Sequence, residues 1–378
     1  MIYFDWAATA LRRPPCVAEA MVRALEELGN PGRGAHPAAL AAGRAISLCR
    51  ERAARLFGCS DPDRVAFAAN ATEALNMTIS GLFAPGDHVI ATAWEHNSAL
   101  RPLYRLEERG LELSILPADG QGRLDWAGLE ALLRPNTRGL VCTHGSNVTG
   151  DLNDVAAAGR FCRERGLLLV VDASQTAGVF PLDLEGMSIS ALCFTGHKSL
   201  MGPQGTGGVC LAPGVVPRPW KVGGSGIRSF DRRHPDRLPE ALEAGTLNGH
   251  GLAGLSAALE WRERMGADAV RERETALARR FRQGVSQVEG VTLYGDGEAP
   301  LRAPIAALNL EGWDAGEVSD ALSRDFDICT RPGAHCAPLI HQALGTAERG
   351  IVRFSFGWYN TEQEVDAGIA AIRALAEA

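Results

Sequence analysis

The sequence predicts an α/β protein with a mostly parallel sheet covered by helices on both faces, followed by a smaller α+β domain. Three observations support this class: short apolar runs recur from about residue 38 onward, helical stretches separate them, and the pattern changes after residue 285. Strands that alternate with helices indicate βαβ units and therefore a parallel sheet.

The expected strands are short runs rich in Val, Ile, Leu and Cys, each followed by a polar or glycine-containing turn. They cover residues 88–93, 111–116, 139–144, 167–172, 191–196 and 207–212. Residues 154–166, DVAAAGRFCRERG, show what connects them, since apolar positions recur at helical spacing and a glycine ends the segment. The sheet therefore has helical crossovers.

A long helical stretch over 251–285 leads into the C-terminal part. There VTLYG, IAALNL, DICTRPG and IVRFSFG alternate with a helical VSDALSRDF, and a terminal helix starts near residue 361. We predict a large α/β domain over 14–265 and a smaller α+β domain formed by 1–13 and 266–378. A cleft between two such domains is a common place for a ligand site.

The chain has 378 residues, a net charge of −7 and a pI near 5.8. It contains no Lys/Arg run, so nucleic acid is not an expected partner. The expected partners are small molecules or other proteins. Without a signal-like or membrane-spanning apolar segment, we expect a cytoplasmic protein. Nine cysteines without a CxxC pair fit reduced thiols, and no residue set has the spacing of a metal site.

Single polar residues stand at the ends of several predicted strands. They lie in AANATEALN, AWEHNSALRPL, HGSNVTG, VVDASQTAG and FTGHKSLMGPQGTGG, and the candidates are Thr72, His96, Asn147, Asp172, Gln175, His197 and Lys198. Each alone has an ordinary structural interpretation, such as a helix cap, a buried histidine or a lysine that reaches to water. Because ligands bind beyond the carboxyl ends of parallel strands, together they predict one site. An amine, a carboxylate and a helix start suit a pyridine ring that carries an aldehyde and a phosphate.

The motifs NATEALN, EHNS, SNVTG, VDASQ, TGHK and EAGT occur in an order that resembles the class V aminotransferase group of fold-type I pyridoxal-phosphate enzymes. Within it, the chain is similar to the cysteine desulfurase and selenocysteine lyase branch, from FDWAATA at 4–10 to RFSFGWYNTEQEV at 353–365. The resemblance implies a sheet of the seven-stranded type, with pyridoxal 5'-phosphate (PLP) as cofactor. The positions that match PLP contacts are Ala71, Thr72, His96, Asn147, Asp172, Gln175, Thr195, His197, Lys198 and Thr246.

The resemblance also implies a role for each position. Lys198 matches the lysine that forms the Schiff base, Asp172 the partner of the pyridine nitrogen, and His96 the residue that stacks on the ring and assists proton transfer. Asn147 and Gln175 would contact the ring oxygen, and Thr72, Thr195 and His197 would hold the phosphate. Thr246 matches a threonine that reaches the phosphate of a neighbouring subunit, which implies a homodimer.

RPGAHCAPLIH, residues 331–341, places Cys336 on a loop after a Pro-Gly turn. Its position matches the sulfur-accepting cysteine of the branch, whose short-loop pattern reads Arg-x-Gly-His-His-Cys-Ala, and Ala334 departs from that pattern. His335, beside the thiol, is expected to favour its thiolate. Arg353 matches the arginine that binds the substrate carboxylate. The expected substrate contacts are Arg353, Asn147, Arg33, His36 and His335.

We therefore expect an enzyme that removes sulfur or selenium from L-cysteine or L-selenocysteine, leaves L-alanine and forms a persulfide on Cys336. A dedicated selenocysteine lyase is the first alternative, and an acceptor protein for the sulfur or selenium is implied. A class V aminotransferase or a cystine lyase is an alternative in which Cys336 is dispensable. A scaffold that keeps its cofactor only for structure is the alternative from another class.

Overall fold

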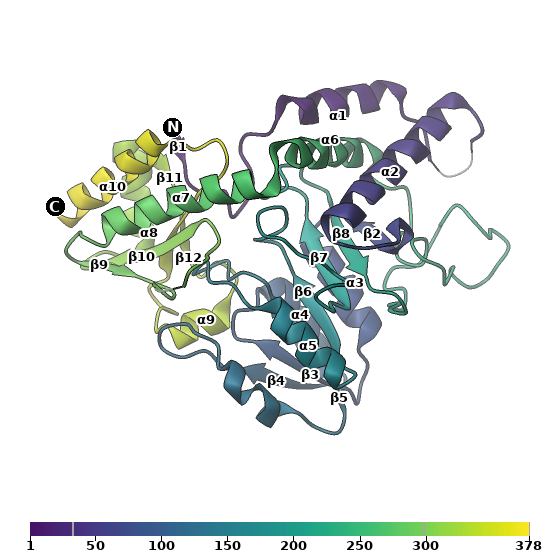
Figure 1. Cartoon of the computed structure of the whole chain (residues 1–378), viewed down its shortest axis with the longest axis horizontal. Coiled ribbons are helices and arrows are strands. Elements are labelled where there is room, and N and C mark those ends of the chain that lie inside the picture. Colours follow the sequence, from purple (N-terminus) through teal and green to yellow (C-terminus); the bar gives the residue numbers. More distant parts are fainter. Residues whose placement is uncertain (32–33, 298, 378) are drawn as a thin grey trace.

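A computed structural model describes residues 1–31, 34–297 and 299–377, and its centre is a seven-stranded sheet (Figure 1). The strand order is β2-β8-β7-β6-β5-β3-β4. Its strands are β2 (Val65–Ala68), β3 (His88–Thr92), β4 (Glu112–Leu116), β5 (Thr137–Thr143), β6 (Leu168–Asp172), β7 (Ala191–Thr195) and β8 (Gly207–Leu211). Strand β8 is antiparallel to both β2 and β7, and the other neighbours are parallel.

Helices cover both faces of this sheet, and each face has its own apolar core. One core joins α2 (Pro37–Leu56), α5 (Val155–Glu164) and α6 (Gly249–Met265) to the strands, and the other joins α3 (Ala71–Leu82) and α4 (Asn97–Glu107) to them. In β6, Leu169 and Val171 enter the first core and Val170 the second. Strands buried on both faces consist almost entirely of apolar residues, which explains the runs in the sequence. Helix α1 (Pro15–Glu27) packs on α6.

A second group of elements lies at the other end of the molecule, beside the chain termini (Figure 1). A four-stranded sheet has the order β12-β13-β10-β9, and a parallel pair joins β1 to β11. These strands are β1 (Ile2–Tyr3), β9 (Val291–Leu293), β10 (Ile305–Leu310), β11 (Ile328–Cys329), β12 (Arg331–Gly333) and β13 (Ile351–Ser355). The helices are α7 (Ala267–Val285), α8 (Ala315–Phe326), α9 (Pro338–Ala343) and α10 (Glu362–Ala376). Short 3-10 turns are η1 (Pro62–Arg64) and η2 (Trp126–Leu132).

The predicted fold class is confirmed, with two differences in detail. The helical stretch over 251–285 is two helices, because Gly266 has a φ of +83° and ends α6 before α7 begins. Strands β1 and β2 lie outside the predicted runs, since two and four residues give little periodicity. The division into domains at residues 265 and 266 stays a prediction. Within the described residues, every helix is too short or too polar to cross a membrane.

Candidate active site

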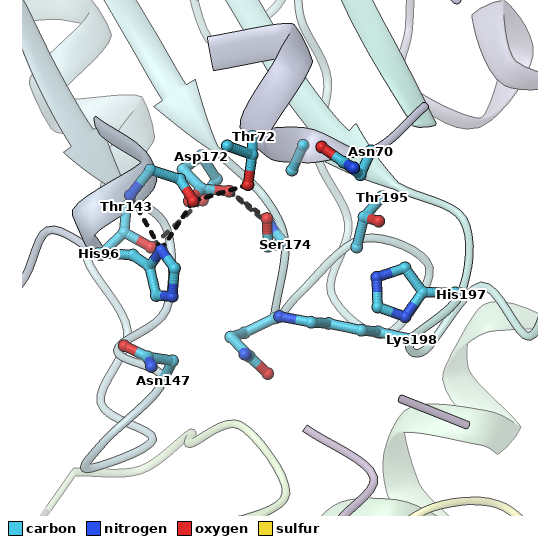
Figure 2. Close-up of a pocket in the computed structure, with 13 residues that line it drawn as sticks. Asn70, Thr72, His96, Thr143, Asn147, Asp172, Ser174, Thr195, His197 and Lys198 are labelled. Atoms are coloured by element: carbon cyan, nitrogen blue, oxygen red, sulfur yellow. Dashed lines mark hydrogen bonds between the residues drawn. The ribbon is translucent and has the colours of Figure 1, made fainter. Parts of the chain in front are cut away.

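A pocket opens at the carboxyl ends of the parallel strands (Figure 2). Its walls come from the turns after β3, β5, β6 and β7 and from the start of α3. The lining residues are Asn70, Ala71, Thr72, His96, Ser98, Thr143, Asn147, Asp172, Ser174, Gln175, Thr195, His197 and Lys198. The structure thus brings together every predicted PLP contact except Thr246.

A buried carboxylate and a lysine are the two charged groups of this pocket. Asp172, only 4% exposed, ends β6, and its Oδ1 accepts hydrogen bonds from the Ser174 backbone N–H at 2.9 Å and from the Ser174 hydroxyl. Lys198 follows β7 by three residues, and burial lowers the pKa of its ammonium to about 8, an effect that Asp172 opposes. An amine with such a pKa is partly neutral near pH 8, as a nucleophile or base requires.

The start of α3 forms one end of the pocket and suits a phosphate. Asn70 caps the helix by accepting the Glu73 N–H at 2.9 Å, so the next backbone N–H groups and Thr72 face the pocket at the positive end of the helix. Thr195 is 3% exposed, and its buried hydroxyl has no hydrogen-bond partner among the described residues. A buried polar group without a partner is costly, so this hydroxyl fits an anion at that place. A Cβ on Gly207 would lie 2.9 Å from the Cα of Asn70, which explains why glycine starts β8.

The two histidines lie on opposite sides of the pocket in Figure 2, with His197 beside Lys198. Burial lowers the pKa of each to about 4, and the charge of Lys198 adds to the effect. Both rings are therefore neutral at pH 7. The Nδ1 of His197 contacts the Thr9 hydroxyl at 3.1 Å, so the segment before α1 reaches the site.

Two amides complete the pocket and bind backbone carbonyls. Gln175 donates to the Ala7 carbonyl at 3.2 Å, and Asn147 donates to the His335 carbonyl at 2.7 Å. The second bond fixes the loop that precedes α9 against the turn after β5.

Cys336 lies on that loop and is the one exposed cysteine, whereas the other eight are buried or partly buried. Its carbonyl accepts the Asn97 N–H at 2.7 Å, so the loop is tied to the start of α4 as well. His335 and Cys336 have φ values of +50° and +56°, a conformation that costs residues other than glycine about 1 kcal/mol or more each. The hydrogen bonds to Asn97 and Asn147 therefore tie a strained stretch of backbone to elements that line the pocket.

The structure corrects the expectation that His335 favours a thiolate. The ring is 4% exposed, its Nε2 lies 3.0 Å from the Arg331 carbonyl, and its Nδ1 is among the buried atoms without a partner. Burial and the positive charge of Arg353 lower the pKa of His335 to about 2. A neutral ring supplies no positive charge to Cys336.

Arg353 is 1% exposed and lies in β13 between the N-terminal segment and the turn after β5. Its Nη2 contacts Asp5 Oδ1 at 3.1 Å and its Nη1 donates to the Asn147 carbonyl at 2.9 Å, while Nε has no partner among the described atoms. Burial lowers the pKa of the guanidinium to about 10, so it stays charged at neutral pH.

Two predicted residues, Thr246 and His36, lie away from the pocket. Thr246 is exposed and lines a separate groove that also contains Glu243 and Gly245. His36 is exposed and caps α2, where its Nδ1 accepts the Ala39 N–H at 3.3 Å. Arg33 lies outside the described residues.

Sequence reasoning missed several residues that belong to the site. Asn70, Ser98, Thr143 and Ser174 line the pocket, and all four stand inside or directly beside the quoted motifs. Arg331 was also missed, and its charge lowers the pKa of both His96 and Lys198.

The chain is similar to known proteins over nearly its whole length. The family model "Aminotransferase class-V" matches residues 2–367. "Probable cysteine desulfurase" from Methanothermobacter thermautotrophicus is 33% identical, and the match covers 96% of this chain and 92% of the relative. "Cysteine desulfurase IscS" from Vibrio campbellii is 31% identical over 98% of this chain and 92% of its own length.

Among solved structures, the apo cysteine desulfurase from Thermococcus onnurineus NA1 is similar with a TM-score of 0.93 and 32% identity, covering 100% of this chain and 94% of that one. The cysteine desulfurase CsdA from Escherichia coli has a TM-score of 0.89 and 30% identity, with coverage of 99% and 94%. The chain therefore belongs to the aminotransferase class-V family.

Proposed function

We propose that this protein is a PLP-dependent cysteine desulfurase that converts L-cysteine into L-alanine and leaves the sulfur as a persulfide on Cys336. The observation that carries the proposal is the position of the one exposed thiol. Hydrogen bonds of 2.7 Å tie its loop to Asn97, the residue after His96, and to Asn147, which itself lines the pocket. Curated relatives named as cysteine desulfurases support the reaction.

The residues present fit the cofactor on which this family depends. The α3 start and the unpartnered Thr195 hydroxyl would hold the phosphate, with Thr72 and His197 beside them. Asp172 would hold a proton on the ring nitrogen, Gln175 and Asn147 would face the ring oxygen, and Lys198 would bond to the aldehyde. When bound, PLP supplies that aldehyde for the substrate amine and a ring that withdraws electrons from Cα.

The chain's own groups then perform the transfer. Lys198, with its pKa near 8, removes and returns the proton at the substrate Cα. The Cys336 thiolate attacks Sγ of the substrate, an S–S bond forms as the substrate Cβ–S bond breaks, and the bonding electron pair stays with Cβ, which takes up a proton. One cysteine and one thiol thus become alanine and one persulfide. Arg353 binds the substrate carboxylate, and Asp5 keeps the guanidinium in place.

The substrate experiment measures alanine release by the PLP-loaded protein with L-cysteine and L-selenocysteine in parallel under reducing conditions. Turnover of cysteine that disappears in Lys198→Ala and in Cys336→Ala is the expected result. Turnover of selenocysteine alone would refute the desulfurase and identify a selenocysteine lyase, with Ala334 as the first position to examine. Cysteine turnover that survives Cys336→Ala would point to a cystine lyase or aminotransferase, and a biological role that survives Lys198→Ala would point to a scaffold.

We also propose a homodimer in which Thr246 of one chain contacts the phosphate of its partner. The segment between β8 and α6 supports this, because Val216, Trp220, Val222 and Phe230 are 43% to 103% exposed on it. It extends away from the body of the molecule in Figure 1. Exposed apolar groups gathered on one segment are typical of an interface. The persulfide sulfur would pass to an acceptor protein, and the free thiols fit a cytoplasmic location.

Mixed dimers test the shared site. Combining a Lys198→Ala chain with a Thr246→Ala chain leaves one intact site per dimer, so one PLP per dimer should bind with wild-type affinity. A doubly substituted chain combined with wild type is the matched control, since each site then has one defect and no site should bind with wild-type affinity. Equal PLP binding in the two mixtures, or a monomer by sedimentation, would refute the arrangement.

A further inference from the structure

Ser98 connects the two sides of the pocket that the proposed function treats separately. Its hydroxyl lies 2.8 Å from the Thr72 hydroxyl at the start of α3 and 2.8 Å from Nδ1 of His96. Its backbone N–H donates to the same Nδ1 at 3.0 Å, since His96 caps α4. One residue therefore contacts both the predicted phosphate cradle and the predicted ring-stacking histidine (Figure 2 shows Thr72 and His96).

The direction of these hydrogen bonds follows from the donors and acceptors present. A backbone N–H is always a donor, so the Nδ1 that faces it is an acceptor and carries no proton. The neutral imidazole must then hold its proton on Nε2. With Nδ1 as acceptor, the Ser98 hydroxyl donates its hydrogen to His96, and its oxygen is left to accept from Thr72.

The surroundings of His96 agree with a neutral ring. Burial lowers its pKa to about 4, and the charges of Lys198, Arg331 and Arg353 act in the same direction, against that of Asp172. The ring also caps the positive end of α4, where a second proton is disfavoured.

We propose that Ser98 is a positioning residue that holds His96 in the tautomer with its proton on Nε2 and couples the orientation of this ring to Thr72. The inference rests on the proposed function for the location of the cofactor. His96 then offers an N–H donor from Nε2, and Nδ1 is not available as a base. If Thr72 moves toward a bound phosphate, the Ser98 hydroxyl, which contacts both Thr72 and His96, transmits that movement to the imidazole.

The test is ¹⁵N NMR of the purified protein labelled at histidine, recorded with and without PLP, with His96→Asn to assign the signal. We expect the wild-type His96 to show an unprotonated Nδ1 and a protonated Nε2 in both states. A wild-type ring with its proton on Nδ1 would overturn the proposal without any variant.

A pair of variants isolates the hydroxyl. Ser98→Ala removes it and keeps the backbone N–H, while Ser98→Thr keeps both and is the matched control. Loss of one hydrogen bond to Nδ1 makes protonation easier, so the His96 titration midpoint should rise by roughly one pH unit in Ser98→Ala and stay within a few tenths of wild type in Ser98→Thr. The facing groups Asp172, Lys198, Arg331 and Arg353 are the same in both variants, so the difference reports the hydroxyl.

The coupling to Thr72 is measured as the dissociation constant of PLP. Ser98→Ala should weaken PLP binding by roughly fivefold, because Thr72 loses its partner, and Ser98→Thr should not. An unchanged midpoint together with unchanged PLP affinity in Ser98→Ala would overturn the role of Ser98. These measurements need no turnover. The role of Ser98 is therefore tested even if the protein shows no desulfurase activity, and the two proposals fail independently.

Discussion

Glu95 is expected to make the protein less stable as the pH rises. Its carboxyl group is 0% exposed, Oε1 accepts from the Thr92 hydroxyl at 2.6 Å and the Thr143 N–H at 2.8 Å, and Oε2 is among the buried atoms without a partner. Burial, with a contribution from Asp172, raises its pKa from 4.5 to about 8. The native state therefore keeps a proton that the unfolded chain loses, so the free energy of unfolding falls as the pH rises from 4.5 through 8.

The size of this effect follows from the two pKa values. Each pH unit within the window costs about 1.4 kcal/mol, so the free energy of unfolding should fall by about 3 kcal/mol between pH 5.5 and 7.5. Glu95→Gln keeps an acceptor for Thr92 and Thr143 and removes the titrating group. We expect the variant to lack this part of the pH dependence and to be the more stable protein at pH 7.5.

Urea unfolding of wild type and Glu95→Gln, followed by tryptophan fluorescence at pH 5.5 and 7.5, measures the difference. Groups other than Glu95 titrate equally in both proteins, so only the difference between their pH slopes matters. The same slope in both would show that Glu95 titrates alike in the native and unfolded states and would refute the reasoning.

Four further outcomes are expected. Cys336→Ala should abolish alanine formation from cysteine, because the thiol that accepts the sulfur is gone, and residual turnover would contradict this. The absorbance of bound PLP should stay unchanged, because Cys336 is not among the residues that line the cofactor pocket. Arg353→Lys should raise KM for cysteine about tenfold, since a single ammonium replaces a planar fork, and an unchanged KM would exclude a carboxylate contact. Phe194→Ala should lower the free energy of unfolding by about 3–5 kcal/mol, because the ring is 0% exposed and its centroid lies 5.0 Å from that of Phe57. A loss under about 1 kcal/mol in urea unfolding would mean that neighbouring side chains fill the cavity and would contradict the prediction. Asp314→Ala removes the capping box of α8 and should cost about 1 kcal/mol in the same assay, with Asp314→Asn, which keeps an acceptor, as the control.

The sequence predicted the parts of the site that depend on strand order. Asp172 ends β6 and Lys198 follows β7, and these two strands are neighbours in the sheet. Because the carboxyl ends of parallel strands share one edge, the two residues are expected to meet there without any knowledge of side-chain packing. The role of Ser98 depends on the distance between the starts of α3 and α4, which spacing along the chain does not give. The pKa of His335, which lies in the turn after β12, is lowered by burial and by Arg353 of β13, and a loop sequence reveals neither.

The contact between Asp5 and Arg353 has a consequence for how the protein is made. Asp5 leaves the ribosome 348 residues before Arg353, yet their ion pair and the parallel pairing of β1 with β11 both join the N-terminal segment to residues beyond 327. The sheet with Asp172 and Lys198 is translated before residue 212, so its strands are able to pair while the substrate-binding end still lacks its arginine. A nascent chain is therefore expected to acquire the groups that hold PLP well before it acquires those that select an amino acid.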